Sequence, residues 1–248
     1  MSSEFPSQSQ SQNANARIWV IVPAAGIGRR FGGLVPKQYL TLNGKSVLEH
    51  TLDQLLRVPQ IECIWLPVSD SDSVWPTIAP RYQNRVISVA GGAERADSVL
   101  NAMRAISGEA RDDDWVLVHD VARPCIRLQD IEKLISSVAN SDVGGLLAVP
   151  VADTLKMAEN DGRVKSTIPR ENLWRAYTPQ MFRFGLLWRG MQEALNGEIS
   201  VTDEASALEL LGYKPLLVEG HSDNIKITHP QDLALAELFL DRIRQAEL

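Results

Sequence analysis

Short apolar runs alternate with amphipathic runs along most of this chain of 248 residues. The apolar runs are rich in β-branched residues and lack strict alternation with polar ones, which is typical of strands covered on both faces of a parallel sheet. They occupy residues 17–23, 61–69, 85–91, 114–120 and 144–151. The pattern predicts a Rossmann-like α/β fold with a doubly wound, mostly parallel sheet. Such sheets bind ligands beyond the carboxyl ends of their strands.

The intervals between these runs show helical spacing. Residues 46–57 place leucines on one face at a period of about 3.6 residues, and residues 94–106 and 128–140 repeat that spacing. Ser46 precedes Glu49 by three residues, which predicts a capping box at the start of the first helix. The chain therefore alternates β and α segments through its first 150 residues or so.

Residues 152–180 interrupt this alternation, because an Asp161-Gly162 turn between β-prone flanks stands where a helix is due. The turn predicts a hairpin, which we interpret as an arm projecting from the sheet at about residues 152–175. An isolated two-stranded hairpin is marginally stable in water, so its apolar side chains need a cover. We expect a second subunit to supply it, which predicts a homodimer joined through the arm. The apolar side chains concerned are Leu155, Met157, Val164 and Ile168.

Composition limits the classes of partner. The chain carries 25 Lys+Arg against 31 Asp+Glu, a net charge of −6, so it lacks the broad basic face of a nucleic-acid-binding protein. No apolar run is long enough to cross a bilayer. The two cysteines, Cys63 and Cys125, form no C-x-x-C pair, which argues against a structural zinc site and suits a reducing cytoplasm.

The two ends of the chain differ in complexity. Residues 1–16 are rich in Ser, Gln and Asn and lack the cationic start and apolar middle of a signal peptide, so we expect a disordered leader. No internal repeat or flexible linker divides residues 17–248. We therefore expect one domain over residues 17–248, with the arm as its appendage.

The loop after the first predicted strand concentrates positive charge within an acidic protein. Residues 24–40 hold four glycines, no acidic residue and three cations, Arg29, Arg30 and Lys37. Glycines let the backbone approach a ligand closely and expose N–H groups, which is how such loops hold phosphates. The spacing matches neither G-x-G-x-x-G nor G-x-x-x-x-G-K-[ST], so the loop predicts a phosphate site of another kind.

Five motifs in order resemble those of the 2-C-methyl-D-erythritol 4-phosphate cytidylyltransferases, a nucleotidyltransferase family of the non-mevalonate isoprenoid pathway. They are PAAGIGRRFGG with PKQYL, GGAERADSVLNA, VLVHDVARPCI, TDEASALE and DNIKIT. The first alone is typical of nucleotidyltransferases that activate sugar or alditol phosphates in general. The later motifs together are far more restrictive, and the resemblance runs from Ile18 to the final helix.

The resemblance implies that the phosphate of 2-C-methyl-D-erythritol 4-phosphate attacks the α-phosphorus of CTP and expels pyrophosphate. Catalysis would then rest on alignment and on neutralising the charge that builds on the phosphoryl oxygens. The resemblance also implies Mg²⁺ as the cofactor, with Asp120 as its protein ligand. The catalytic cations that it implies are Arg30, Lys37, Arg170 and Lys226.

The other site residues follow from the same resemblance by position. Those implied to contact the nucleotide are Pro23, Ala24, Ala25, Gly26, Gly28, Arg30, Lys37, Gly91, Gly92, Arg95, Ser98, Asp120 and Val121. Those implied to contact the methylerythritol phosphate are Asp120, Arg123, Thr154, Arg170, Thr178, Thr202 and Lys226. Val121 stands where the family commonly has alanine, a change that a backbone contact tolerates.

Three other functions stay open on the sequence alone. A related cytidylyltransferase could act on another alditol phosphate, such as ribitol 5-phosphate. A regulatory module would bind CTP without turnover, and it would leave Arg170 and Lys226 without a role. A dinucleotide-dependent oxidoreductase is disfavoured because the glycine spacing of the first loop is wrong for it.

Overall fold

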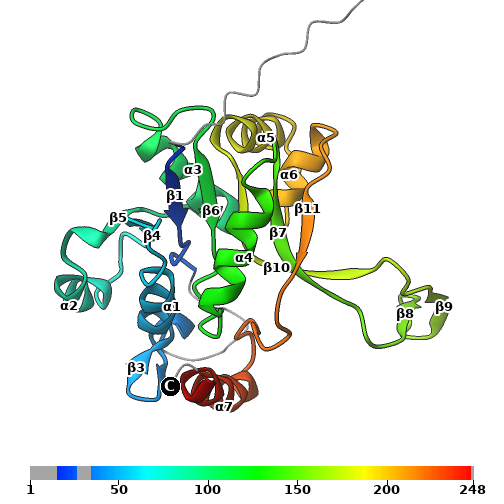
Figure 1. The fold of residues 1–248 in the computed structure, drawn as a ribbon. Helices are drawn as coiled ribbons and strands as arrows, with labels where there is room; N and C mark the ends of the chain where they lie inside the picture. The colour runs from blue at the N-terminus through cyan, green and yellow to red at the C-terminus, as the bar shows by residue number, and fades with distance from the viewer. Residues whose placement is uncertain (1–15, 27–34, 247–248) are drawn as a thin grey trace, which may run out of the picture.

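Seven strands form the central sheet in the computed structural model, which describes residues 16–26 and 35–246 (Figure 1). Across the sheet they are β11 (Leu216–Glu219), β7 (Gly144–Pro150), β10 (Trp174–Arg183), β6 (Trp115–Val118), β1 (Ile18–Ile21), β4 (Ile64–Val68) and β5 (Val86–Ala90). Each predicted apolar run contains one of these strands, so the predicted α/β fold is confirmed. Residues 1–15 of the expected leader lie outside the described residues.

β10 runs antiparallel to both its neighbours, β6 and β7, and every other pair in this sheet is parallel. The carboxyl ends of β1, β4, β5 and β6 therefore meet at one edge. Because Gln180 of β10 pairs with Val118 at the end of β6, the first half of β10 reaches the same edge. This edge carries the loops that contain most of the predicted site residues.

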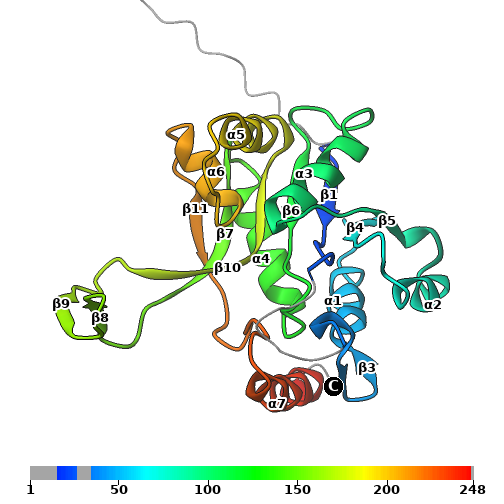
Figure 2. The ribbon, with the colours of Figure 1, turned by 180° about the vertical axis from the view of Figure 1, so that it is seen from behind.

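The central strands are buried on both faces. Val20 of β1 packs in one apolar core and its neighbour Ile21 packs in the other, which explains why the predicted strands lack polar alternation. Figures 1 and 2 show the two helical layers from opposite sides. The first core includes α1 (Val47–Leu55), α2 (Trp75–Ile78) and α4 (Leu128–Val138), and the second includes α3 (Arg95–Ile106), α5 (Phe184–Asn196) and α6 (Glu204–Leu210).

A third, smaller core lies beneath the last helix, α7 (Gln231–Ala246). Leu42, Cys125, Ile227 and Leu240 are buried in it, so α7 fixes the segment before it against the loop after β6. None of the described helices has the length and apolar character that a membrane span requires. The remaining short elements are β2 (Thr41–Leu42), β3 (Lys45–Ser46), and the 3₁₀ turns η2 (Lys37–Tyr39), η3 (Ala79–Arg81) and η4 (Gln83–Arg85).

The predicted capping box at the start of α1 is confirmed. The backbone N–H of Ser46 donates to Oε2 of Glu49 at 2.9 Å, and the backbone N–H of Glu49 donates to Oγ of Ser46 at 3.2 Å. Two N–H groups that the helix itself cannot pair are thereby satisfied, so α1 begins at Val47.

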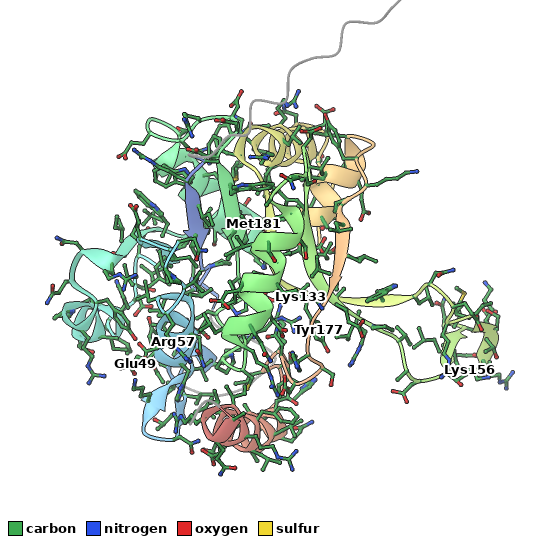
Figure 3. The ribbon with its side chains drawn as sticks, in the orientation of Figure 1. Glu49, Arg57, Lys133, Lys156, Tyr177 and Met181 are labelled. Carbon is green, nitrogen blue, oxygen red and sulfur yellow. The ribbon has the colours of Figure 1, made fainter. Side chains whose placement is uncertain are left out.

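The arm is a two-stranded antiparallel hairpin that projects from the main body (Figure 1). Its strands are β8 (Leu155–Ala158) and β9 (Val164–Ile168), and Gly162 in the turn has a φ of +84°. Met157 is 47% and Val164 is 64% exposed. Figure 3 shows Lys156 on the arm, apart from Tyr177 and Met181 of the main body. The predicted hairpin and its exposed apolar residues are therefore both present.

The arm ends earlier than the sequence predicted. Trp174 already pairs with Pro150 of β7, and the N–H of Val151 donates to the carbonyl of Leu173 at 2.9 Å to close its base. Residues 174 and 175, which we had assigned to the arm, belong to the main sheet instead. A register shift between Ala176 and Gln180 breaks the regular strand pattern, so periodicity did not indicate β10.

Candidate active site

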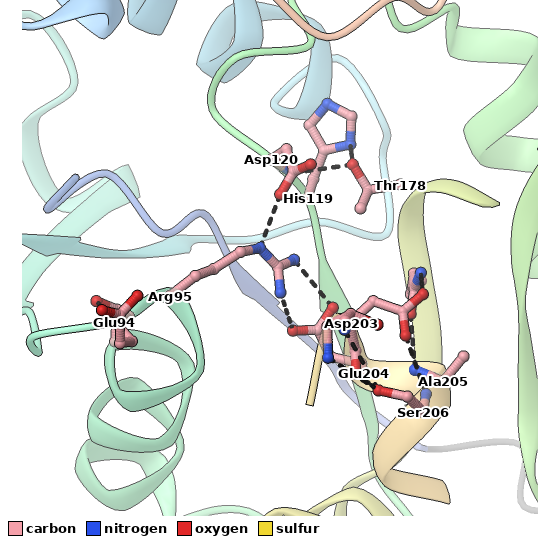
Figure 4. Close-up of polar contacts among 12 residues, drawn as sticks. Glu94, Arg95, His119, Asp120, Thr178, Asp203, Glu204, Ala205 and Ser206 are labelled. Carbon is pink, nitrogen blue, oxygen red and sulfur yellow. Dashed lines mark hydrogen bonds and ion pairs between the residues drawn. The ribbon is translucent and has the colours of Figure 1, made fainter. Parts of the chain in front are cut away.

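A buried carboxylate, Asp120, contacts three cations at the carboxyl edge of the sheet. It lies two residues beyond β6 and is 7% exposed. Its Oδ1 accepts a hydrogen bond from Nε of Arg95 at 2.8 Å, as Figure 4 shows. Its Oδ2 lies 2.9 Å from Nζ of Lys226 and 3.4 Å from Nε of Arg123. Because these residues come from α3, the turn after β6 and the segment before α7, the fold brings distant motifs together.

Arg95 also contacts a second buried carboxylate, Glu204, which is the first residue of α6 and 1% exposed. Nη1 of Arg95 donates to Oε1 of Glu204 at 2.7 Å, and Nη2 donates to Oε2 at 3.0 Å. We call Arg95, Asp120, Arg123, Glu204 and Lys226 the Asp120 cluster. With three cations and two carboxylates, the cluster has an excess of positive charge.

The cluster holds Asp120 and Arg95 in their charged forms. Burial by itself opposes ionisation of Asp120, but the charges of Arg95, Lys226 and Arg123 outweigh it and lower the pKa of this carboxyl group. Burial likewise opposes protonation of Arg95, yet Glu204 and then Asp120 raise the pKa of its guanidinium. The ion pairs therefore persist through the neutral pH range.

Hydrogen bonds through Thr178 and His119 hold the backbone of Asp120. The N–H of Asp120 donates to Oγ1 of Thr178 at 3.0 Å, and this oxygen lies 3.0 Å from Nδ1 of His119. Nε2 of His119 lies 3.1 Å from the carbonyl oxygen of Arg123. A carbonyl only accepts, so Nε2 carries the proton and Nδ1 accepts from the Thr178 hydroxyl. Burial lowers the pKa of His119 to about 4, which keeps the ring neutral at pH 7.

The segment before α7 connects the cluster to the first loop. The carbonyl oxygen of Asn224 accepts from Nη1 of Arg123 at 2.7 Å, and its Nδ2 donates to the carbonyl of Thr178 at 2.8 Å. The carbonyl oxygen of Ile227 accepts from Nζ of Lys37 at 3.1 Å. Lys37 is thereby held beside Ile227, the residue that follows Lys226.

The first loop runs along the same edge. Its backbone continues to pair with β4 beyond β1, because the N–H of Ala24 donates to the carbonyl of Pro67 at 2.8 Å. Nε2 of the buried Gln38 donates to the carbonyl of Ala24 at 2.8 Å. Pro23, Ala25 and Gly26 follow this path. Two predicted residues, Gly28 and Arg30, lie outside the described residues.

The loop after β5 packs closely against the first loop. A Cβ on Gly91 would lie 2.2 Å from the Cβ of Ala25, and a Cβ on Gly92 would lie 2.2 Å from the Cβ of Asp97. Glycine is therefore required at both positions by packing. Ser98 is buried and supports this loop, since its Oγ accepts from the N–H of Gly92 at 3.0 Å and donates to the carbonyl of Glu94 at 3.2 Å.

Four other predicted residues lie around the cluster or away from it. Val121 is 6% exposed, its side chain packs in the core, and its carbonyl oxygen accepts a hydrogen bond from Thr51. Thr202 is exposed and precedes the N-cap of α6. Thr154 and Arg170 are exposed at the base of the arm, where the Arg170 side chain donates to the carbonyl of Ala152. Among the described residues, no hydrogen bond or ion pair joins these two to the cluster.

Sequence reasoning missed Glu204 and Gln180. Glu204 lies in the TDEASALE motif and is the first residue of α6. Gln180 lies in β10, which the sequence did not reveal. A carboxylate on the inner face of an amphipathic helix was the available signal for Glu204, because such a group needs a buried partner.

Asp120 is the candidate protein ligand for a metal ion at this edge of the sheet. Among residues 16–26 and 35–246, no group of three or more His, Cys, Asp or Glu side chains is arranged to hold a metal ion. Both oxygens of Asp120 contact cations, so Mg²⁺ would have to share them. Mg²⁺ is commonly held by one or two carboxylates plus substrate phosphates, and Asp120 fits that arrangement as the single carboxylate.

The comparison with known proteins decides the family. The family model described as 2-C-methyl-D-erythritol 4-phosphate cytidylyltransferase, IspD, matches residues 18–242. The chain belongs to this family. Two curated proteins of the same name are similar to it. One, from Hahella chejuensis, is 59% identical over 231 residues, covering 93% of this chain and 96% of the relative. The other, from Vibrio atlanticus, is 51% identical over 225 residues, covering 91% and 96%.

Solved IspD structures share the fold. The crystal structure of 2-C-methyl-D-erythritol 4-phosphate cytidylyltransferase from Francisella tularensis superposes with a TM-score of 0.79 at 37% identity, covering 90% of this chain and 100% of that one. Membership of the IspD family confirms the resemblance carried by the five motifs, and with it the prediction of a CTP-using nucleotidyltransferase.

Proposed function

We propose that the Asp120 cluster and the first loop form the site at which the protein transfers the cytidylyl group of CTP to 2-C-methyl-D-erythritol 4-phosphate. Membership of the IspD family supports the reaction. The observation that carries the location is that Lys37 and Arg123 both donate to backbone carbonyls of residues 224–227, the segment whose Lys226 contacts Asp120. Several cations at one edge suit a reaction in which both substrates carry phosphate.

The chemistry requires no covalent bond to the protein. An oxygen of the substrate phosphate forms a bond to the α-phosphorus of CTP, and the bond from that phosphorus to the bridging oxygen breaks, so the electron pair leaves with pyrophosphate. Lys37 and Lys226 neutralise the charge that builds on the phosphoryl oxygens, and Arg30 is assigned the same role by resemblance. The contacts of Lys37 with the Ile227 carbonyl and of Lys226 with Asp120 hold these two cations in place before substrates arrive.

The nucleotide lies along the loops after β1 and β5. Backbone N–H groups near Gly26 face the triphosphate, as glycine-rich loops at this position commonly do. Arg95 contacts the nucleotide, whereas Ser98 acts through the backbone of Gly92. Val121 contributes its backbone, because its side chain is in the core.

Mg²⁺ is the metal we propose for this site. Asp120 would hold it together with oxygens of the triphosphate, whose negative charge offsets the cations around Asp120. When bound, the ion would neutralise charge on the triphosphate and on the pyrophosphate that leaves. Removing Mg²⁺ with EDTA should abolish turnover. If monovalent salt alone restored full activity, the proposed requirement for a divalent ion would be contradicted.

The second substrate is held by residues from two regions. Thr178, Arg123 and Lys226 lie at the cluster, while Thr154 and Arg170 lie at the base of the arm. We propose that the arms of two subunits clasp to form a homodimer and thereby complete each site. Support comes from the exposed apolar side chains Met157 and Val164, which a symmetric contact would cover.

We further propose that residues 17–248 act as one domain in the cytoplasm. The seven-stranded sheet draws strands from both halves of the chain, since β1 and β11 belong to the same sheet. The thiols of Cys63 and Cys125 are unpaired, which suits a reducing compartment. Cell fractionation that recovered the native protein with periplasmic markers would contradict this location.

A pyrophosphate-release assay tests the reaction. The purified protein with CTP and Mg²⁺ should release pyrophosphate when given 2-C-methyl-D-erythritol 4-phosphate, and much less with ribitol 5-phosphate or with ATP in place of CTP. Turnover confined to ribitol 5-phosphate would favour the related alditol phosphate enzyme. Binding of CTP with no turnover on either alditol phosphate would favour a regulatory module.

A further inference from the structure

Glu204 contacts one member of the Asp120 cluster, Arg95. It is 1% exposed, and both its carboxylate oxygens accept hydrogen bonds from Arg95, at 2.7 and 3.0 Å. A buried carboxylate is unfavourable unless it is paired and hydrogen-bonded, and the bidentate contact with a guanidinium is a strong way to achieve this. The buried Glu204 carboxylate therefore depends on Arg95 as its charged partner, and Glu204 in turn orients the Arg95 guanidinium.

Arg95 is held between two carboxylates that come from different elements. Its Nε donates to Asp120 at 2.8 Å, while its two terminal nitrogens donate to Glu204, as Figure 4 shows. These bonds use three of the five N–H groups of the planar guanidinium, so two can still reach a ligand. The side chain is 28% exposed, which places those groups within reach of solvent and of a nucleotide.

β10 positions both carboxylates. Oε1 of Gln180 accepts from the N–H of Ala205 at 2.8 Å, and Nε2 donates to Asp203 at 2.9 Å, so Gln180 ties the start of α6 to the sheet. Two residues earlier, Thr178 accepts from the N–H of Asp120. β10 therefore sets the distance between the Asp120 and Glu204 carboxylates, and this distance defines the position of the Arg95 guanidinium.

We propose that Glu204 is a positioning residue for CTP, which fixes the plane of the Arg95 guanidinium at the nucleotide site without contacting the nucleotide itself. The inference rests on the proposed function, in which Arg95 contacts the nucleotide. Losing one partner of a bidentate charged contact frees the guanidinium to rotate and to pair with Asp120 alone. Binding of CTP must then order the Arg95 side chain, which has an entropic cost, so the affinity for CTP falls.

Glu204→Gln tests this in the full chain, with Glu209→Gln as the matched control on the exposed face of the same helix. We expect Glu204→Gln to weaken CTP binding about tenfold by isothermal titration calorimetry, the scale of one charge-assisted hydrogen bond. The KM for CTP should rise similarly, while the KM for the alditol phosphate stays within about twofold. Glu209→Gln should leave both constants unchanged. Unaltered CTP affinity in Glu204→Gln would overturn the proposal.

A double-mutant cycle with Arg95→Lys separates positioning from a purely structural role. If Glu204 acts through Arg95, adding Glu204→Gln to Arg95→Lys should weaken CTP binding little further, whereas additive losses would contradict the proposal. Should Glu204→Gln fail to fold, Glu204→Asp keeps the charge but shortens the side chain, and a smaller loss of CTP affinity is expected. Calorimetry measures binding without turnover, so a wild-type protein that binds CTP but releases no pyrophosphate would refute the proposed reaction alone.

Discussion

The Asp120 cluster and the arm differ in what surrounds their proposed site residues. Asp120 and Glu204 are 7% and 1% exposed, and their partners come from α3, the turn after β6 and the segment before α7. Thr154 and Arg170 on the arm are exposed, and the Arg170 side chain contacts Ala152 of the arm's own base. The ion pairs of the arm are likewise local, such as Arg163 with Asp161 at 3.6 Å.

The residues of the Asp120 cluster are preorganised within one chain, whereas we propose that the arm residues are positioned by a partner subunit. Breaking a buried ion pair by removing one member costs about 3–5 kcal/mol, because the remaining charge is left uncompensated. An exposed pair contributes about 0–1 kcal/mol. The chain alone therefore fixes the cluster, whereas we propose that a second subunit fixes the arm residues over a substrate.

Removing the arm should have the largest effect on activity. Replacing residues 152–172 with a short Gly-Ser turn retains the contact between Val151 and Leu173, so the pairing of β7 with β10 should survive. We expect a folded monomer that binds CTP but has no measurable turnover. Light scattering and calorimetry check these outcomes, and an unchanged dimer would refute the clasp.

The arm replacement also removes Thr154 and Arg170, so a second variant is needed. Met157→Glu with Val164→Glu puts charge on the exposed apolar face and keeps both proposed substrate residues. If the clasp positions those residues, this variant should also be monomeric and nearly inactive. Full activity in a monomer would show that each site is complete within one chain.

Lys37→Ala should lower kcat by ~10²–10³-fold, the usual scale for losing one electrostatic contact to a transition state. Its melting temperature should change little, because Lys37 is held by its contact with the Ile227 carbonyl at a polar edge and is not part of a core. Lys214→Ala, at an exposed position, is the control. A rise in KM at unchanged kcat would instead make Lys37 a ground-state binding residue.

Asp120→Asn should destabilise the fold by about 3 kcal/mol, since Lys226 and Arg123 lose their charged partner in a buried site. The matched change in the arm, Asp161→Asn, should cost less than about 0.5 kcal/mol because its ion pair is exposed. Urea unfolding of the two variants measures both values. Equal losses would contradict the contrast between the two regions.

His119 should make stability depend on pH with a smaller effect. Burial lowers its pKa to about 4, while the unfolded chain has an ordinary value of about 6.5. Between these values the unfolded chain binds the proton that the native protein does not, so stability falls as pH drops through this window, by at most roughly 3 kcal/mol. His119→Gln should flatten the urea-unfolding profile between pH 6.5 and 4, and an unchanged slope would contradict this assignment.

The fold was predictable where the signal is local. Burial on both faces makes β1, β4, β6 and β7 apolar throughout, so an apolar run in the sequence indicates each of these strands. β10 carries no such mark, because its register shifts between Ala176 and Gln180 and its first residues are exposed. The same strand positions Thr178 and Gln180, so missing it also hid how the site is assembled.

By itself, the sequence determined the family, the β-α-β order, the hairpin and most of the candidate site residues, since motifs and periodicity are properties of neighbouring positions. Only the tertiary structure decided which of those residues meet. Arg95 and Glu204 are 109 positions apart, and Lys37 and Ile227 are 190 apart, yet each pair is in contact. The role of a buried charge depends on the partner that folding supplies, and no local pattern specifies that partner.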